Sequence, residues 1–343
     1  MANFYIASCT QEGSGGIYRY DLTAEEEIDF KDFAPLKKAN WMTFSKNRRF
    51  FYSTCQYDSE SGGVAAFAVD DEGKLSFINA LPSGGLSCCY VALSPDEKFA
   101  YAANYQSGTF AEFALQAGKL HCRTKLISHG RYPLGPQSDR QESAHPHFCA
   151  FAPDGRYLLV VDLGIDAVLA YPYTPEQGIS PELVTVNYLP AGCGPRHLIF
   201  DRSGKIAYLL NELGNSLFSL SYGEGRVEII NTITTLPRHV NQPTKAAAVR
   251  LSEDEKYLFA SNRGFDSIAI FELDGSGGMK FHDLQLSGGV SPRDINFLPG
   301  GKWFAAANEF SDNVMFYEYA PEGELKPNGY NITELIRPLN IIF

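Results

Sequence analysis

The sequence predicts an all-β fold: a seven-bladed propeller of four-stranded blades, formed by residues 1–343 as a single domain. Three observations lead to this prediction. The chain is rich in aromatic residues and glycine, with 24 Phe, 19 Tyr and 31 Gly, as expected of strands joined by tight turns. A unit of two apolar runs separated by a polar turn recurs along the chain. The two chain ends together supply one further unit.

The recurring unit is clearest in residues 145–162 and 194–212. In each, an apolar run is followed by a polar turn and then by a second apolar run that ends in a polar residue. The residue eight places before the end of each second run falls at Asn47, Asp96, Asp154, Ser203, Asp254 and Gly300, so that successive units lie 49, 58, 49, 51 and 46 residues apart. A period near 50 residues without helical periodicity is typical of propeller blades.

The first strand of each blade is a short run that we expect to line the central channel. These runs cover residues 38–44, 87–93, 145–151, 194–200, 245–251 and 291–297. A turn such as Ser94-Pro95-Asp96-Glu97-Lys98 follows each run. Pro, Asp and Gly favour a tight reversal there, so the first and second strands are predicted to form a hairpin.

The second strand of each blade is nearly all apolar, which suits an element buried on both faces between stacked blades. These strands are expected at residues 50–55, 99–104, 157–162, 206–211, 257–262 and 303–308. Third strands are expected at residues 63–69, 109–115, 167–173, 216–220, 267–273 and 313–319. A more variable outer strand, for example residues 227–230, completes each blade.

The chain ends are predicted to complete the ring. Residues 4–9 match a second strand and residues 16–21 match a third strand, but no first strand precedes them. The C-terminal strand 337–343 matches a first strand, so it is predicted to pair beside the N-terminal strand 4–9 and to close the seventh blade. Closure removes the open sheet edges that otherwise invite aggregation.

The composition limits the classes of partner. A net charge of −11 and a pI near 5.2 argue against nucleic acid or an anionic membrane as a partner, because both favour a basic surface. Seven cysteines without a CxxC pair are expected to be buried free thiols of a cytoplasmic protein. The N-terminus lacks the features of a signal peptide, and the chain has no apolar run of 18 residues. No pattern in the sequence sets an oligomeric state.

One mouth of the predicted channel collects polar residues, because first strands start and second strands end on the same face. At the third position of the first strand the blades carry Asn40, Cys89, His147, Arg196, Ala247, Arg293 and Leu339. Just past the second strand they carry Thr10, Gln56, Tyr105, Leu163, Glu212, Arg263 and Glu309. Burying charged groups near an axial cavity costs folding free energy unless they form ion pairs or bind a ligand.

The mouth is therefore the candidate site. His147, Arg196, Glu212 and Arg263 supply a neutralisable base, a carboxylate and two guanidinium groups, which suit acid–base work on an anion. Further candidates for substrate binding are Arg140, Gln141, His145, His197, Arg293 and Glu309. Arg140 and Gln141 belong to the longest departure from the repeat, residues 123–144, and a loop of this length is usually functional. The alternative is that the acids only pair with the arginines and hold the blades together.

Other chemistries are less well supported. His145 and His147 could hold a metal with Glu212, but Pro146 disturbs the strand alternation that would aim both rings alike. Ser143 near His145 lacks a third partner for a nucleophilic triad. No phosphate-binding Gly-Lys-Ser/Thr loop and no G-x-S-x-G motif is present. We therefore expect neither a metal nor a cofactor.

On these residues the chain resembles the lactonase family of seven-bladed propellers, which includes propeller-type 6-phosphogluconolactonases and 3-carboxy-cis,cis-muconate lactonizing enzymes. The resemblance covers essentially the whole chain and rests on Gly135-Pro136, Arg140-Gln141-Glu142, Ala144-His145-Pro146-His147, Gly194-Pro195-Arg196-His197, Asn211-Glu212, Ser261-Asn262-Arg263-Gly264, Ser291-Pro292-Arg293 and Asn308-Glu309. The catalytic set proposed for the muconate enzymes is one His, two Arg and one Glu, and the resemblance implies that it would fall on His147, Arg196, Arg263 and Glu212. The chain departs from the expected pattern at Asp294, where a His would follow the Arg.

The leading hypothesis is hydrolysis of a sugar lactone, 6-phosphogluconolactone, without a cofactor. His147 or Glu212 would activate water, and Arg196 and Arg263 would stabilise the oxyanion or grip the phosphate. A cycloisomerase acting on a carboxylated muconate would use the same arginines for carboxylates. A non-catalytic propeller that binds a protein or peptide is the third hypothesis, and it predicts that the mouth residues can be changed without loss.

Overall fold

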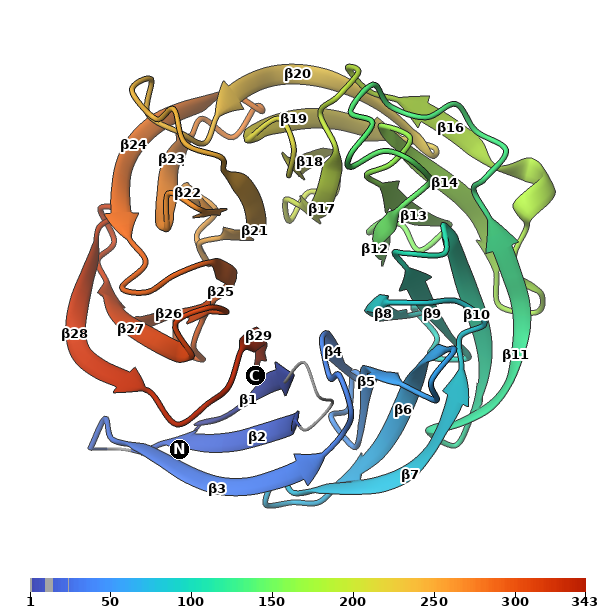
Figure 1. Cartoon of the computed structure of the whole chain (residues 1–343), viewed down its shortest axis with the longest axis horizontal. Helices are drawn as coiled ribbons and strands as arrows, with labels where there is room; N and C mark the ends of the chain where they lie inside the picture. Colours follow the sequence, from blue (N-terminus) through green and yellow to red (C-terminus); the bar gives the residue numbers. More distant parts are fainter. Residues whose placement is uncertain (1, 10–14, 24) are drawn as a thin grey trace.

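The fold prediction is confirmed by a computed structural model that describes residues 2–9, 15–23 and 25–343. The described residues form seven antiparallel sheets, arranged as blades around a common axis (Figure 1). The sequence repeat therefore corresponds to the blade repeat, offset so that the first blade is shared between the two chain ends.

The inner and second strands form the hairpin that the sequence predicts in each blade. The inner strands are β4 (Met42–Phe44), β8 (Cys88–Leu93), β12 (Pro146–Phe151), β17 (Pro195–Phe200), β21 (Lys245–Leu251), β25 (Pro292–Phe297) and β29 (Pro338–Ile342). The second strands are β1 (Ala2–Cys9), β5 (Phe50–Gln56), β9 (Phe99–Asn104), β13 (Tyr157–Asp162), β18 (Ile206–Asn211), β22 (Tyr257–Arg263) and β26 (Trp303–Asn308). The largest difference from expectation is β4, which is shorter than predicted because residues 38–41 are not strand.

The outer half of each blade is more variable. The third strands are β2 (Gly15–Leu22), β6 (Gly62–Val69), β10 (Thr109–Gln116), β14 (Ala167–Thr174), β19 (Ser216–Gly223), β23 (Ser267–Leu273) and β27 (Asn313–Tyr319). The outer strands are β3 (Ile28–Pro35), β7 (Leu75–Pro82), β11 (Lys119–Ser128), β20 (Arg226–Thr234), β24 (Met279–Leu286) and β28 (Leu325–Ile332). In the remaining blade the outer edge is split into β15 (Gly178–Ile179) and β16 (Thr185–Tyr188), separated by the 3-10 turn η1 (Pro181–Leu183).

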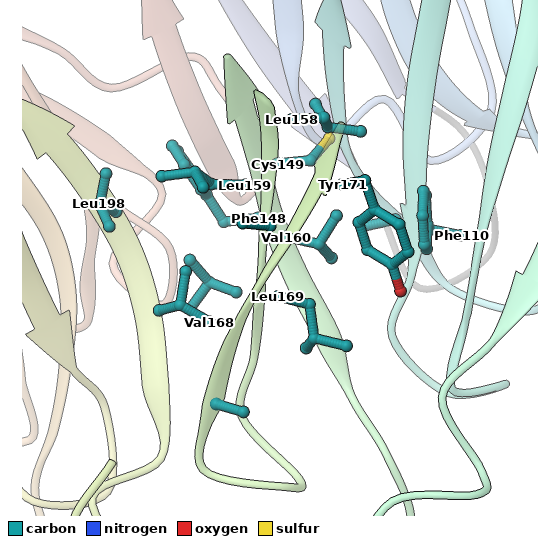
Figure 2. Packing of buried hydrophobic residues seen from close by; sticks show 14 of the residues in the cluster. Phe110, Phe148, Cys149, Leu158, Leu159, Val160, Val168, Leu169, Tyr171 and Leu198 are labelled. Atoms are coloured by element: carbon teal, nitrogen blue, oxygen red, sulfur yellow. The ribbon is translucent and has the colours of Figure 1, made fainter. Parts of the chain in front are cut away.

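The core lies between neighbouring blades, because second strands are apolar on both faces. In β13, residues Leu158 to Val161 are all fully buried. Figure 2 shows Val160 on the side of Phe110, which belongs to the preceding blade, and Leu159 on the side of Leu198, which belongs to the following blade. A strand without polar alternation is thus explained by contacts with two sheets rather than one.

Asp294, the departure from the expected motif, anchors the closing strand. Its buried carboxylate accepts hydrogen bonds from the Asn340 side chain at 2.7 Å and from the Ile341 backbone at 3.0 Å, and it pairs with Arg250 at 2.8 Å. These contacts fix β29 where it pairs with β1, as the sequence predicts (Figure 1). The Asp therefore helps to hold the strand that closes the ring.

We expect Asp294→Asn to lower the free energy of unfolding by about 3–5 kcal/mol, because an amide leaves Arg250 without its charge partner inside the protein. Urea denaturation followed by the fluorescence of the two tryptophans measures this change. Asp283→Asn, at an exposed position on β24, is the control and is expected to change stability by less than about 0.5 kcal/mol. Equal midpoints for the two variants would contradict the anchoring role.

Candidate functional site

An extra residue interrupts strand pairing at the same place in six inner strands of the described chain. In β12, Pro146 pairs with Asp162 and Phe148 with Val161, which leaves His147 as the bulged residue. The other bulges fall at Cys89, Arg196, Ala247 and Ala248, Arg293, and Leu339. A bulge bends the strand and re-aims a side chain. Six of the seven third-position residues predicted at the mouth are thus ones that the bulges release from regular pairing.

Aspartates in the turns between second and third strands hold the start of the next inner strand. Asp166 accepts hydrogen bonds from the backbone N–H groups of Gly192 at 2.6 Å and Gly194 at 2.8 Å. Gly194 has a φ of 56°, and a Cβ there would lie 2.3 Å from the side chain of Leu213, so glycine is required. This bracing fixes the backbone two residues before Arg196.

Glu212 is the centre of the site. Its carboxylate is bonded by three guanidinium groups: Oε1 by Arg140 at 2.7 Å, and Oε2 by Arg196 at 3.0 Å and Arg263 at 2.8 Å. These four residues, here called the Glu212 cluster, carry two net positive charges. Only 3% of Glu212 is exposed. The cluster therefore combines a buried carboxylate with an excess of cations suited to an anionic ligand.

The charge states in the Glu212 cluster follow from burial and mutual contact. Burial alone would raise the pKa of Glu212, but the charges of Arg263 and Arg196 outweigh it and hold that pKa well below its usual range. Burial and the charge of Arg263 lower the pKa of Arg196 to about 9, so it remains a cation at neutral pH. Although burial acts to lower it, the pKa of Arg140 is raised by its hydrogen bonds to Glu212 and Tyr105. The Glu212 carboxylate is consequently ionised and engaged, which makes it a weak base.

His147 lies beside this cluster as a neutral imidazole. Burial, together with the charge of Arg196, holds its pKa well below its usual value. Its Nδ1 is buried and makes no hydrogen bond among the described residues. Tyr105 and His197 contact the ring, with centroids 5.7 and 5.3 Å away. His147 thus offers an unengaged ring nitrogen at neutral pH.

The long loop delivers Arg140 to Glu212. It spans residues 129–145 rather than beginning at residue 123, because β11 continues through Ser128. His129, fully buried, bonds Asp162 at 2.7 Å and Tyr171 at 3.0 Å, and Asp162 also accepts the His145 N–H at 2.7 Å. These contacts tie both ends of the loop to the blade beneath it.

Gln141, His197 and His145 were also predicted to bind substrate, but their described contacts are with backbone groups and aromatic rings. Gln141 is 1% exposed, and its amide bonds the backbone of Leu163 and Gln137, so it supports the loop instead of reaching the mouth. His197 is enclosed by aromatic rings, with Trp41 at 5.1 Å. His145 stacks on Tyr105 at 4.3 Å and bonds its carbonyl oxygen, so it positions the Tyr105 that meets Arg140.

Arg293 and Glu309 pair in a second carboxylate centre. Arg293 approaches Glu309 at 3.4 Å, and Arg337 bonds the other carboxylate oxygen. Burial acts to raise the pKa of Glu309, but Arg293 and Arg337 lower it. Arg337 was not among the predicted site residues. Its signal lay in the sequence: it occupies the same position at the start of an inner strand as His145 and Lys38. Thr10, predicted at the mouth, lies outside the described residues.

Metal ligation finds little support in the described ranges, since no group of three or more His, Cys, Asp or Glu side chains there could hold a metal ion. Ser143 Oγ lies 3.5 Å from His145 Nε2, at the limit of a hydrogen bond. Among the described residues, no helix has the length and apolar character needed to cross a bilayer.

Stability should fall as the pH drops below about 6.5, because the folded-state pKa values of His147 and His197 are both held well below the unfolded value. Below pH 6.5 both histidines are protonated in the unfolded chain but stay neutral in the folded chain, so acid favours unfolding. Each histidine contributes up to about 1.4 kcal/mol per pH unit. Urea midpoints measured from pH 7.5 to 5.0 test this, and His197→Gln should flatten the dependence whereas exposed His121→Gln should not. A flat profile in the wild type would refute it.

Comparisons with known proteins agree with one another. The family model described as "Lactonase, 7-bladed beta-propeller" matches residues 3–336. The 6-phosphogluconolactonase of Bacillus subtilis (strain 168) is 33% identical over 322 residues, which cover 92% of this chain and 90% of that protein. The periplasmic gluconolactonase of Pseudomonas aeruginosa has a TM-score of 0.91 at 27% identity, covering 99% of this chain and 98% of that one. A candidate 6-phosphogluconolactonase from Bacteroides fragilis also gives 0.91, at 29% identity over 99% and 97%.

Proposed function

The chain belongs to the family of seven-bladed β-propeller lactonases, and we propose that the lactone it hydrolyses is 6-phosphogluconolactone, giving 6-phosphogluconate. The observation that carries the proposal is the neutral, unengaged His147 beside the guanidinium groups of the Glu212 cluster. Lactone opening needs a base for water and cations for the developing oxyanion, and this arrangement offers both.

His147 is assigned the role of general base. It removes a proton from water as the water oxygen forms a bond to the lactone carbonyl carbon. When the ring C–O bond breaks, the same proton passes to the departing alkoxide, so the imidazole returns to its neutral state. Glu212 is not assigned this role, because both of its oxygens are bonded to guanidinium groups.

Arg196 and Arg263 are assigned to the oxyanion. Both guanidinium groups are held on one carboxylate oxygen of Glu212, so their geometry is fixed before substrate arrives. Preorganised donors of this kind stabilise developing charge without reorganisation during the reaction. Arg140, whose Nη1 is buried without a partner among the described residues, supplies a further donor at the edge of the site.

The test is hydrolysis of freshly prepared 6-phosphogluconolactone by the purified protein, with spontaneous opening subtracted. Catalysis by the wild type that disappears in Arg196→Ala supports the proposal. Arg226→Gln, on the exposed outer strand β20, is the matched control and should retain the wild-type rate. A folded wild type that leaves the lactone untouched but converts a carboxylated muconate would select the cycloisomerase instead.

We further propose the cytoplasm as the site of action. Buried cysteine side chains support this, since Cys55, Cys88, Cys89, Cys149 and Cys193 lie in the protein interior as thiols. Burial raises the pKa of the Cys55 and Cys89 thiols to about 12, which keeps them protonated and unreactive.

A further inference from the structure

A pocket of about 320 Å³ lies across the mouth from the Glu212 cluster and is lined by Arg293, Glu309 and Arg337. We propose that this pocket, here called the Glu309 pocket, binds the phosphate of the substrate while the lactone carbonyl lies at His147. The inference rests on the proposed lactone hydrolysis and adds to it the determinant of selectivity for a phosphorylated sugar.

The cations of the pocket come from three different blades. Lys38 precedes β4, Arg293 is the bulged residue of β25, and Arg337 precedes β29. These strands are consecutive around the ring, on the side opposite β12 and β17 (Figure 1). Among the described residues the lining includes two carboxylates, Glu309 and the exposed Asp58, against three cations, so these residues together carry a net positive charge. A phosphate binds favourably where cations are in excess and converge from several directions.

Donors remain available in the pocket after its internal bonds are made. Glu309 engages one terminal nitrogen of Arg337 and one of Arg293. The Nε of Arg337 is buried and has no partner among the described residues. Lys38 is exposed on the rim, where its ammonium group can reach a ligand. Glu309 therefore orients the arginines and leaves further N–H groups for an incoming anion.

Most of the other described side chains that line the pocket are polar, with the exposed Asp58 among them. They include amide and hydroxyl side chains from Gln56, Ser59, Ser61, Ser87 and Gln106. Such groups both donate and accept hydrogen bonds, as the hydroxyl groups of a sugar require. The pocket thus combines cations suited to a phosphate with hydrogen-bonding groups suited to a polyol.

Arg293 connects this pocket with the reaction centre. Its charge helps to lower the pKa of His147 and of Arg196, and it also contacts Glu309. Conversely, the charge of Arg263 in the Glu212 cluster helps to lower the pKa of Glu309. The two carboxylate centres therefore influence each other across one mouth, and the proposal places the carbonyl of the substrate at one centre and its phosphate at the other.

The test compares kcat/KM for 6-phosphogluconolactone with kcat/KM for unphosphorylated glucono-1,5-lactone. Arg337→Gln and Lys38→Gln are each expected to lower this ratio about 10- to 100-fold, the range for losing one charge-assisted hydrogen bond, mainly through KM for the phosphorylated lactone. Arg226→Gln should keep the wild-type ratio. Arg337 adjoins the closing strand, so thermal melts are measured to show that Arg337→Gln is folded. Lys38→Gln is the second variant because it removes an exposed side chain on the rim.

Calorimetric binding of 6-phosphogluconate and gluconate separates this inference from the proposed reaction. Weaker binding of 6-phosphogluconate in both variants, with gluconate binding unchanged, supports the pocket. This holds even if the wild type opens neither lactone, and in that case only the proposed function fails. Wild-type affinity for 6-phosphogluconate and a wild-type kcat/KM ratio in both variants would overturn the pocket while leaving lactone hydrolysis intact.

Discussion

Replacing His147 with glutamine is expected to lower kcat for lactone hydrolysis by about 10²- to 10⁴-fold, the usual contribution of a general base. Glutamine retains a hydrogen-bonding side chain of similar length but has no basic nitrogen. Stopped-flow measurement of acid release, with the spontaneous rate subtracted, gives the value. The expected loss is in kcat, since the guanidinium groups that hold the substrate are unchanged.

Two controls separate this effect from a general loss of structure. His121→Gln removes an exposed histidine from β11 and should leave kcat unchanged. Binding of 6-phosphogluconate to His147→Gln should stay close to that of the wild type. A folded His147→Gln protein with kcat within threefold of the wild type would exclude His147 as the base.

Replacing Glu212 with glutamine should have the largest combined effect on stability and activity. The substitution leaves Arg140, Arg196 and Arg263 without their shared counter-charge in a buried setting. Breaking a buried ion pair on one side costs about 3–5 kcal/mol of unfolding free energy. We expect kcat/KM to fall at least about 100-fold as well, because the oxyanion donors lose the group that orients them.

Added anions provide a sharp test of this interpretation. If the guanidinium groups repel one another in Glu212→Gln, phosphate should raise its melting temperature more than that of the wild type, since the anion replaces the missing carboxylate. Glu212→Asp keeps the charge with a shorter reach and should retain most of the stability. A Glu212→Gln protein as stable and as active as the wild type would show that the cluster does not depend on this carboxylate.

Sequence patterns predicted the fold well because each blade repeats the same local chemistry. Apolar second strands recur in every unit, and five of the six complete units have an Asp or Gly in the turn before that strand. The register of residues 337–343 with the other inner strands predicted ring closure. The pattern did not show how far each outer strand runs. β11 extends to Ser128 by pairing with Thr109, and this partner depends on the whole sheet rather than on local composition.

The sequence predicted where the site residues lie better than it predicted which groups their side chains contact. The alignment brought His147, Arg196, Glu212 and Arg263 to one mouth, because bulged residues and second-strand ends share a face. It did not show that Gln141 bonds the backbone of its own loop, since a loop conformation leaves no periodic signal. Arg337 was missed because it was treated as part of the closing strand, whereas its side chain reaches Glu309.

The pairing of β29 with β1 joins strands from opposite ends of the described chain, and it links assembly of the ring to ligand binding. Until residues 338–342 have left the ribosome, β1 lacks its inner neighbour and its inner edge is unpaired. Arg337 reaches Glu309 only once this last segment docks, so the Glu309 pocket is complete only in the closed ring. If the pocket holds the substrate phosphate as proposed, the substrate binds the closed ring in preference to the open one. By mass action, substrate bound in this way would make ring opening rarer and slow proteolysis of the protein.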